Sequence, residues 1–489
     1  MTESGEAGRA AARVSPLLRE RALIGGQRRS SRSGATIAVD DPFTGEVVTR
    51  VPAMDAAETD EAIAAAAAAF GPWSERPAIE RGRRLRAWYD LILAHKEDLA
   101  RLITLENGKP LREARAEIDY GAGFVEFYAE EAPRAYGELI PATVPGRSLR
   151  ATREPVGVCA AITPWNFPVA MLTRKIAPAL AAGCTLVAKP AQQTPLSALA
   201  LAVLAEAAGI PPGVINVVTG HAATVGGAIT ASPVVRKLSF TGSTAVGALL
   251  IAQCAPSVKR VSMELGGNAP LLVFADADLD TALETAMVAK FRNSGQSCIA
   301  ANRIYVEAGI HDRFVAAFAE RIAAPRSGDG FDEASDIGPL IEPAAVAKVN
   351  AHLDDALKRG ASLLTGGRGE RRMMPPTLLA GVARDARLTR EETFGPLAAV
   401  VEFSGLDEGL RLANDTPFGL AAYVCSTDPC TIERAARGIE SGMVGINTGL
   451  ISTAHAPFGG VKQSGLGREG SRLGLDEYLS VKYLCQAGI

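Results

Sequence analysis

The strongest constraint on the fold is an alternation of short apolar runs with alanine-rich segments that begins after Pro155. Strands that alternate with helices of three or more turns form right-handed crossovers, and these build a parallel, doubly wound sheet. The pattern runs once before Gly266-Gly267 and once after it, which predicts two α/β lobes with a cleft between them. The expected strands are 156–162, 185–188, 214–218, 237–240, 260–265, 270–274, 303–306, 398–403, 421–425 and 444–447.

Helical periodicity dominates the residues before this alternation and separates its strands. Apolar residues recur at three- and four-residue steps between Arg83 and Tyr136, after an alanine run at 61–70, which predicts a helical N-terminal layer. The segments 148–154 and 478–484 read as extended, and the second follows a glycine-rich stretch at 458–470. The helices expected between strands are 169–182, 196–208, 244–254, 279–291, 312–323, 406–414 and 431–439.

Composition excludes several classes of protein. The 489 residues contain 51 Lys plus Arg and 54 Asp plus Glu, so no bulk charge favours nucleic acid or an anionic membrane. Apolar runs such as 176–188 are shorter than the ~20 residues that span a bilayer, so no membrane span is expected. Seven cysteines fit a reducing compartment, and we expect a cytoplasmic protein whose first twenty or so residues are a frayed tail rather than a secretory signal or an organellar presequence.

Several polar residues stand where a parallel sheet places its ligands, after the carboxyl ends of strands. Asn166 lies in the stiff loop 163–168, Lys189 ends the next strand, and Glu264 ends a strand before two glycines. Cys298 follows a small polar loop, where backbone amides, Lys290 or Arg292 would stabilise a thiolate. Each residue taken alone has an ordinary alternative: a turn-forming Asn, an exposed Lys, a solvated Glu and an inert loop Cys.

Other cysteines and motifs are less informative. Cys159, Cys184 and Cys425 sit in apolar, strand-like settings and are expected to be buried and inert. The 465–470 segment fits G-x-G-x-x-G but is too near the end of the sequence for the unit that this motif requires. The 242–247 segment follows a strand and begins a helix, which suits phosphate binding. It lacks the Lys-Ser/Thr ending of a P-loop, so ATP hydrolysis is not supported. Five histidines without paired spacing make a catalytic metal unexpected.

As an ordered set, these segments resemble the NAD(P)-dependent aldehyde dehydrogenase superfamily from about Ile37 to Leu484. The resemblance is carried by Pro164-Trp-Asn-Phe-Pro168, Lys189-Pro190, Phe240-Thr-Gly-Ser243, Met263-Glu-Leu-Gly-Gly-Asn268, Gly295-Gln-Ser-Cys298, Glu391-Glu-Thr-Phe-Gly-Pro396 and Pro457-Phe-Gly-Gly460. It implies a cofactor-binding lobe (1–130 and 151–265), a catalytic lobe (266–450) and a small β arm (131–150 and 451–489) that serves oligomerisation, in a homodimer or homotetramer.

Within the superfamily the chain is most similar to the succinate-semialdehyde dehydrogenases. The features that carry this likeness are Leu172-Thr-Arg-Lys175, Lys290-Phe-Arg-Asn293, Gly449-Leu-Ile-Ser452 and the 460–470 segment. The resemblance implies that Arg174, Arg292 and Ser452 hold the carboxylate of the substrate. A guanidinium forks two N–H bonds onto a carboxylate, and a neutral aldehyde gains nothing from that grip.

The resemblance also implies a mechanism. The Cys298 thiolate attacks the aldehyde, Asn166 and the Cys298 backbone N–H stabilise the oxyanion, hydride passes to the nicotinamide, and Glu264 activates the water that hydrolyses the thioester. The residues implied in cofactor binding are Thr163, Pro164, Trp165, Lys189, Gln192, Gly242, Ser243, Glu392 and Phe394. Gln192 stands where NAD-preferring relatives often carry Glu, and because a neutral amide does not repel a 2′-phosphate, both cofactors are expected, with a slight lean to NADP.

Other functions remain open at this point. A glutarate-type or other carboxylated semialdehyde is the nearest alternative, because one methylene is worth only ~1 to 3 kcal/mol of discrimination. A broader aliphatic aldehyde dehydrogenase and a thiol esterase without redox chemistry are further alternatives. A binding protein built on a retired enzyme would have lost Cys298 or Glu264, and the chain retains both.

Overall fold

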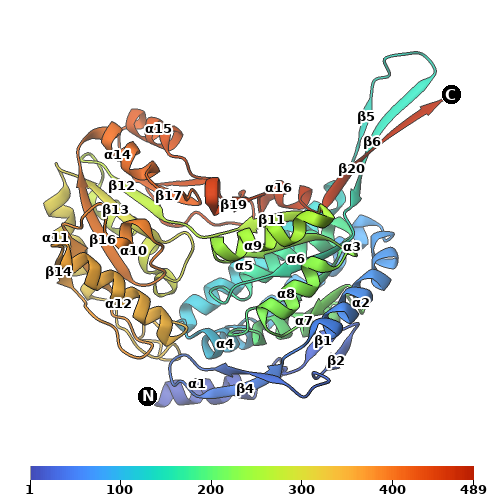
Figure 1. The fold of residues 1–489 in the computed structure, drawn as a ribbon, viewed down its shortest axis with the longest axis horizontal. Coiled ribbons are helices and arrows are strands. Elements are labelled where there is room, and N and C mark those ends of the chain that lie inside the picture. Colours follow the sequence, from blue (N-terminus) through green and yellow to red (C-terminus); the bar gives the residue numbers. More distant parts are fainter. Residues whose placement is uncertain (1, 489) are drawn as a thin grey trace.

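An eight-stranded sheet forms the centre of the first lobe. The computed structural model describes residues 2–488 (Figure 1). In it this sheet has the order β19-β11-β10-β7-β8-β9-β1-β2. The five strands from β11 to β9 are parallel, and β1, β2 and β19 join antiparallel. Its strands are β1 (Ala22–Ile24), β2 (Gln27–Arg29), β7 (Val158–Ile162), β8 (Thr185–Lys189), β9 (Ile215–Val217), β10 (Val235–Thr241), β11 (Arg260–Glu264) and β19 (Gly465–Leu466).

The second lobe contains a seven-stranded sheet of order β14-β15-β16-β13-β12-β17-β18, which is parallel except at β14. The strands β7, β8, β12 and β17 are buried along their whole length, which explains their continuous apolar runs. The predicted architecture of two doubly wound α/β lobes is confirmed. The strands are β12 (Ala269–Val273), β13 (Ala301–Glu307), β14 (Ser362–Thr365), β15 (Thr377–Ala380), β16 (Leu397–Phe403), β17 (Ala421–Cys425) and β18 (Met443–Ile446).

Helices cover both sheets, and their ends carry local signals. Asp55 and Glu58 form a reciprocal capping box at the start of α2, and Gly183 ends α6 in the left-handed region. Buried aromatic residues, among them Trp88 and Phe124, fill the core between the N-terminal helices and the first sheet. The helices are α1 (Glu3–Arg13), α2 (Ala56–Ser74), α3 (Ala78–Ala94), α4 (Lys96–Asn107), α5 (Leu111–Glu131), α6 (Ala170–Ala182), α7 (Leu196–Ala207), α8 (Ala222–Ala231), α9 (Thr244–Cys254), α10 (Leu279–Phe291), α11 (His311–Ala323), α12 (Pro343–Lys358), α13 (Arg387–Arg390), α14 (Gly405–Asn414), α15 (Pro429–Gly438) and α16 (Ser471–Asp476).

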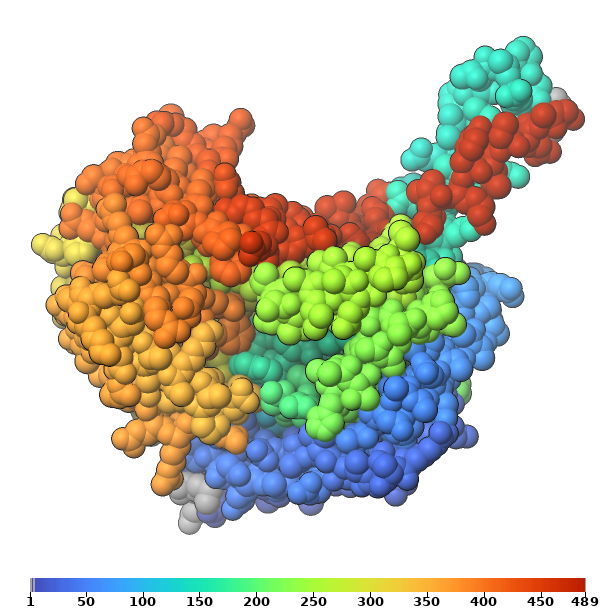
Figure 2. All heavy atoms as spheres, viewed as in Figure 1, coloured from blue at the N-terminus to red at the C-terminus, as the bar shows by residue number. Residues whose placement is uncertain are grey.

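A three-stranded antiparallel sheet projects from the body as an arm. It consists of β5 (Glu138–Ile140), β6 (Arg147–Pro155) and β20 (Leu479–Ala487), in the order β20-β6-β5. Figure 2 shows it standing clear of both lobes. Large apolar side chains on it are exposed, with Leu139 at 86% and Val481 at 71% of their full accessibility.

The sequence does not predict several elements that lack a strong hydrophobic or helical pattern. These elements are the hairpin β3 (Thr36–Asp40) and β4 (Val47–Pro52), the helices α8 and α12, the edge strand β14 and its neighbour β15. The edge strand β14 is largely exposed and so lacks a continuous apolar run, while α8 is rich in glycine, which has low helix propensity. Among residues 2–488, no helix combines the length and the apolar content that a membrane span requires.

The expectation of a frayed N-terminal tail is wrong. Residues 3–13 form α1, which Thr2 caps. The buried Arg9 donates through Nε to Asp41 at 2.6 Å and through both terminal nitrogens to Asp329 at 2.6 and 2.7 Å. A composition rich in Arg and Ala gave no sign of this, because the two acidic partners lie far apart in the sequence.

Candidate active site

The carboxyl ends of four neighbouring strands bring the expected residues to one edge of the first sheet. The register pairs Thr241 of β10 with Glu264 of β11, and Ile162 of β7 with Lys189 of β8. Gly242 and Thr163 follow directly on two of these strands. Residues separated by about a hundred positions therefore share one edge, as parallel pairing requires.

Cys298 is presented by a strained loop between α10 and β13. Three successive residues of this loop, Asn293, Ser294 and Gly295, have left-handed φ values of 53°, 55° and 71°. A Cβ on Gly295 would lie 2.4 Å from the carbonyl oxygen of Gly395, so only glycine fits there. Consecutive left-handed residues persist only where surrounding contacts hold them.

Hydrogen bonds from several elements hold this loop in place. The Glu113 carboxylate accepts the backbone N–H of Asn293 at 2.9 and 3.1 Å. The Asn293 side-chain amide donates to the Asn166 carbonyl at 2.9 Å, and Ser294 donates to Gly338 at 2.9 Å. The side chain of Gln296 accepts the N–H of Ile341 at 3.0 Å. The position of Cys298 is thus fixed by both lobes before any ligand binds.

Burial dominates the protonation of Cys298. It raises the pKa of the thiol to about 12, an effect that the nearby Arg174 guanidinium opposes. Among the groups with the largest effects on this pKa, the cation is Arg174 rather than the expected Lys290 or Arg292, while a backbone hydrogen bond at Cys298 also lowers the pKa, as expected of the backbone amides. Lys290 is itself buried with no hydrogen-bond partner for Nζ in the described part of the chain, and burial lowers its pKa to about 7.

The alkylation rate of the free enzyme should therefore rise with pH. Far below its pKa, the thiolate fraction grows about tenfold per pH unit, so the reaction of Cys298 with iodoacetamide should accelerate about a hundredfold between pH 7 and pH 9. Peptide mass spectrometry separates Cys298 from the exposed Cys430 and Cys485. A rate that levels off below pH 8 would contradict this protonation state.

Glu264 lies at the end of β11 with its carboxyl group buried. Neither carboxyl oxygen has a hydrogen-bond partner among residues 2–488, and a Cβ built on Gly459 would approach one of them to 3.0 Å. Burial and the neighbouring Glu469 raise the pKa of Glu264 well above its usual range, against the influence of Arg174 and Lys175. A carboxyl group in this state is able to hold a proton.

Asn166 lies beside the 293–298 loop, the candidate nucleophile loop. Its side-chain Nδ2 donates to the carbonyl of Gln296 at 3.0 Å, two residues before Cys298, while Oδ1 has no partner in the described chain. The flanking Pro164 and Pro168 stiffen the loop. The amide therefore reaches the nucleophile loop from the first lobe.

The residues expected to bind a dinucleotide lie on both lobes. Ser243 caps the N-terminus of α9, and Gly242 donates its N–H to the Glu264 carbonyl at 3.0 Å. The buried Lys189 Nζ donates to the Pro190 carbonyl at 3.1 Å, and burial lowers its pKa to about 8. A helix N-terminus and a buried cation at the same edge of the sheet suit a phosphorylated ligand.

The second lobe supplies the other side of this region. The ring of Trp165 meets that of Phe394 edge to face at 5.5 Å, which joins the two lobes. Glu392 accepts the N–H of Gly267 at 3.3 Å, and burial raises its pKa to about 7. Gln192 is exposed and lines a separate cavity of about 300 Å³, to which Lys189 does not contribute.

Arg292 and Ser452 lie together in a cavity of about 190 Å³. Arg292 stacks over the ring of Phe167 at 5.2 Å. Its side chain makes no direct hydrogen bond or ion pair with residues 2–488, although its charge acts on the Glu113 carboxylate, which lines the same cavity. Glu113, Glu117, Tyr120 and Leu450 also line this cavity. An unpaired guanidinium in a small cavity is a ready partner for an anion.

Arg174 does not line that cavity but lies deeper. Its Nε forms an ion pair with Glu469, and its guanidinium stacks over Phe458 at 4.4 Å. Both terminal nitrogens are buried without a hydrogen-bond partner among the described residues. Burying N–H groups of a charged guanidinium without acceptors is costly, and a ligand oxygen would relieve that cost.

Sequence reasoning missed Glu113, Glu469 and Tyr120. Glu113 and Tyr120 sit on α5, where their spacing resembles that of any amphipathic helix. Glu469 forms ion pairs with Arg174 and Lys175. It lies in a glycine-rich segment whose sequence does not indicate a buried carboxylate. The one usable signal was the density of charged residues on an otherwise buried helix.

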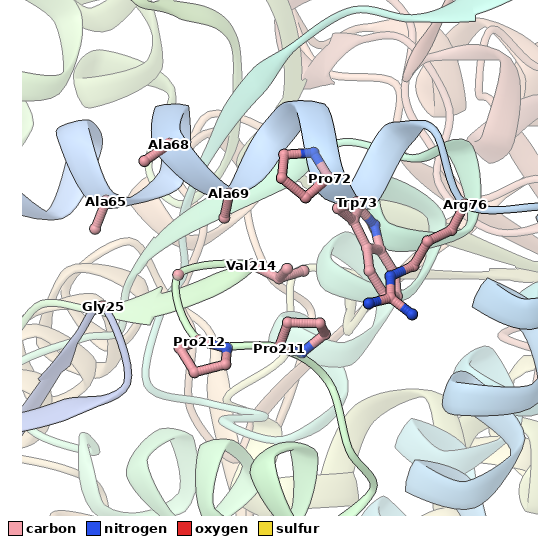
Figure 3. Close-up of a pocket in the computed structure, with 11 residues that line it drawn as sticks. Gly25, Ala65, Ala68, Ala69, Pro72, Trp73, Arg76, Pro211, Pro212 and Val214 are labelled. Carbon is pink, nitrogen blue, oxygen red and sulfur yellow. The ribbon is translucent and has the colours of Figure 1, made fainter.

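A separate cavity of about 410 Å³ lies away from these residues, between α2 and the loop before β9 (Figure 3). Alanines 65, 68 and 69 face Pro211 and Pro212 across it, and Arg76 is its charged lining residue. None of the candidate site residues lines it. Between residues 2 and 488, no group of three or more His, Cys, Asp or Glu side chains has a metal-binding arrangement.

Comparison with known proteins adds to this geometry. Residues 29–484 match the aldehyde dehydrogenase family. The chain is 54% identical to a 3-sulfolactaldehyde dehydrogenase of Pseudomonas putida, covering 97% of this chain and 98% of that one. It is 53% identical to a glutarate-semialdehyde dehydrogenase of P. putida and 52% to an NADP(+) succinate-semialdehyde dehydrogenase of Escherichia coli, with 96% and 98% covered in both cases. The structure of a succinate-semialdehyde dehydrogenase from Burkholderia pseudomallei superposes with a TM-score of 0.95 at 53% identity, covering 96% and 98%.

Proposed function

Because this chain belongs to the aldehyde dehydrogenase family, we propose that it oxidises succinate semialdehyde to succinate with NADP or NAD. The observation that carries this proposal is the unpaired guanidinium of Arg292 beside Ser452 in a cavity of about 190 Å³. A carboxylated aldehyde supplies the anion that this guanidinium lacks. A neutral aldehyde would leave it without a partner.

Each group of the site has a place in the reaction. The Cys298 sulfur attacks the aldehyde carbon, and Asn166 Nδ2 and the Cys298 backbone N–H donate to the oxygen as it becomes negative. A dinucleotide held between the two lobes would supply the hydride acceptor, and Cys298 would then carry the acyl group as a thioester. Glu264 then takes a proton from the water that hydrolyses the thioester. The buried, unpartnered carboxyl group of Glu264 fits that role.

The residues of both lobes fit a dinucleotide. Ser243 and the N–H groups at the start of α9 would hold its phosphates, together with Trp165. Lys189 would bind the adenine ribose and Glu392 the nicotinamide ribose, with Phe394 beside the ring. Thr163 and Pro164 would line the path between these groups.

Replacing Arg292 by alanine should impair carboxylated aldehydes selectively. A charge-assisted, forked contact contributes about 1.5 to 3 kcal/mol, so kcat/KM for succinate semialdehyde should fall about 10- to 100-fold. The value for a neutral aldehyde such as butanal should change less than about twofold. Arg313→Ala, an exposed change on α11, is the control. An equal loss for both aldehydes would contradict the carboxylate clamp.

A second candidate substrate class follows from the relatives. Enzymes named for glutarate semialdehyde and 3-sulfolactaldehyde are as similar to this chain as the one named for succinate semialdehyde. All three aldehydes carry an anionic group, so Arg292 and Ser452 would serve each of them. Steady-state kinetics of the parent protein with the three aldehydes decides among them. If the parent oxidises neutral aldehydes but none of these three, all three are excluded as substrates.

The preference between cofactors is proposed to be weak, with a lean to NADP. The neutral amide of Gln192 does not repel a 2′-phosphate, and a relative with NADP(+) in its name is 52% identical. Gln192→Glu should lower kcat/KM for NADP about tenfold relative to NAD, because it places like charges together. A thousandfold preference of the parent for NAD would contradict this proposal.

The projecting arm is proposed to join copies of the chain. Its exposed Leu139, Val481 and Tyr483 would be covered by a second copy in a homodimer or homotetramer. We also propose that residues 1–130 and 151–265 bind the cofactor, that 266–450 carry the catalytic cysteine, and that 131–150 and 451–489 bridge subunits of a cytoplasmic enzyme. Sedimentation of the parent and of Val481→Asp tests the arm, since a wholly monomeric parent would contradict it.

A further inference from the structure

We propose that a second chamber, outside the cavity of Arg292 and Ser452, binds the distal end of longer ω-carboxylated aldehydes through Arg321. This inference rests on the proposed function and extends it from succinate semialdehyde to aldehydes whose carboxylate lies several methylenes further from the carbonyl. The inner cavity measures about 190 Å³ and the outer chamber about 540 Å³. The outer chamber therefore offers additional room for a longer chain.

The two spaces are adjacent parts of one path. Glu113, Ala116, Arg292 and Leu450 line both of them. A substrate whose aldehyde reaches towards Cys298 and whose chain is too long for the inner cavity must extend past these residues. The outer chamber is the space that it enters.

The wall of the outer chamber suits a methylene chain. Met287, Val288 and Phe291 of α10 contribute apolar surface, and Ile337 and Leu450 add to it. Leu450 is 60% exposed, which leaves its side chain available for contact. Burying methylene groups against such a surface is favourable and non-directional, so it tolerates chains of different lengths.

Its charges favour an anionic end group. Three arginines (112, 292 and 321) and two carboxylates (Glu113 and Asp336) line the chamber. Both carboxylates are already engaged: Glu113 by the Asn293 N–H, and Asp336 by Arg112 at 3.0 Å and the Arg326 N–H at 3.1 Å. The lining of the chamber therefore carries one more arginine than carboxylates.

Arg321 is the guanidinium best placed to serve the far end. It lies on α11, lines the outer chamber and does not line the inner one. It donates one hydrogen bond to Asp280 at 2.8 Å and forms a longer ion pair with Glu284 at 3.8 Å, and both carboxylates are largely exposed. A guanidinium has five N–H donors, so Arg321 retains several for a carboxylate. Arg292 would hold a short substrate and Arg321 the carboxylate of a long one.

A chain-length series with surface variants tests this assignment. The measurement is kcat/KM for the semialdehydes of succinate, adipate and suberate, and for a neutral aldehyde as long as the suberate compound. Arg321→Ala should lower the suberate value about fivefold and Arg321→Glu about twentyfold, because a half-exposed ion pair is partly screened. Succinate semialdehyde and the neutral aldehyde should change less than about twofold. Arg313→Ala on the same helix is the matched control.

Dicarboxylates provide a readout that does not depend on turnover of the long aldehyde. Suberate should inhibit the parent competitively against succinate semialdehyde, and Arg321→Glu should weaken that inhibition at least about fivefold while leaving inhibition by succinate unchanged. If Arg321→Glu changes inhibition by suberate no more than Arg313→Ala does, the outer site is refuted. The proposed oxidation of succinate semialdehyde would be unaffected by that result. If the parent oxidises no carboxylated aldehyde, the proposed function fails first.

Discussion

Cys298→Ser is expected to lower the rate of aldehyde oxidation at least about a thousandfold. Without an adjacent base, a serine hydroxyl is a far weaker nucleophile than a cysteine thiolate. The side chain lies within a loop that contacts from both lobes already fix, so serine should be presented in the same place. The measurement is the rate of NAD(P)H formation at saturating semialdehyde, together with cofactor binding, which should be unchanged.

Cys430→Ser is the matched control for this variant, because Cys430 is exposed on α15 and far along the chain from the nucleophile loop. It should turn over at the rate of the parent. Turnover by Cys298→Ser at the parental rate would remove the covalent mechanism altogether. Hydrolysis of activated esters by the parent with no NAD(P)H formed from any aldehyde would point instead to an esterase.

Glu264→Gln should separate the two halves of the reaction. The amide cannot take a proton from water, so kcat should fall about 10²- to 10⁴-fold while thioester formation continues. The variant should give a burst of one NAD(P)H per active site and then nearly stop. Mass spectrometry of the stalled protein should find the acyl group on Cys298, and hydroxylamine should release it.

The protonation of Glu264 adds a pH dependence to this prediction. Because burial raises its pKa, the carboxyl group of the free enzyme is protonated at low pH and gains its charge only as the pH rises well above the usual range of a glutamate. Hydrolysis by the parent should therefore increase with pH, and the slow rate of Glu264→Gln should lack that rise. Glu284→Gln, an exposed change on α10, is the control. If Glu264→Gln shows no burst and keeps the parental kcat, Glu264 is not the base that activates water.

Local patterns were sufficient for the elements that are buried. The strand β17 and the helices α9 and α10 lie at the predicted residues, and the ends of most other strands in the parallel core agree within about two residues. A strand that is buried on both faces must be a continuous apolar run, and this signal is readable without tertiary knowledge. The exposed edge strand β14 and the glycine-rich α8 lack such a signal, because neither presents a continuous apolar run or a strong helix-forming sequence.

Some residues of the candidate site could be identified from local sequence patterns, and others could not. Asn166, Lys189 and Glu264 were identifiable because each follows or ends a strand, and the register of parallel strands places such ends at one edge. Glu113 and Arg174 obtain their significance from neighbours that are distant in the sequence. The carboxylate that fixes the nucleophile loop lies 180 residues before it, and the partner of Arg174 is Glu469.

The sequence alone therefore determined the class of fold, the alternation that builds it and the residues with the chemistry for covalent catalysis, since these depend on local propensity and on side-chain type. Tertiary structure decided which cation lies near Cys298, which guanidinium remains unpaired, and which residues line both the inner cavity and the space outside it. These properties depend on distances between residues that only packing brings together. Burial and electrostatic coupling change steeply over a few ångströms, and no spacing in the sequence specifies them.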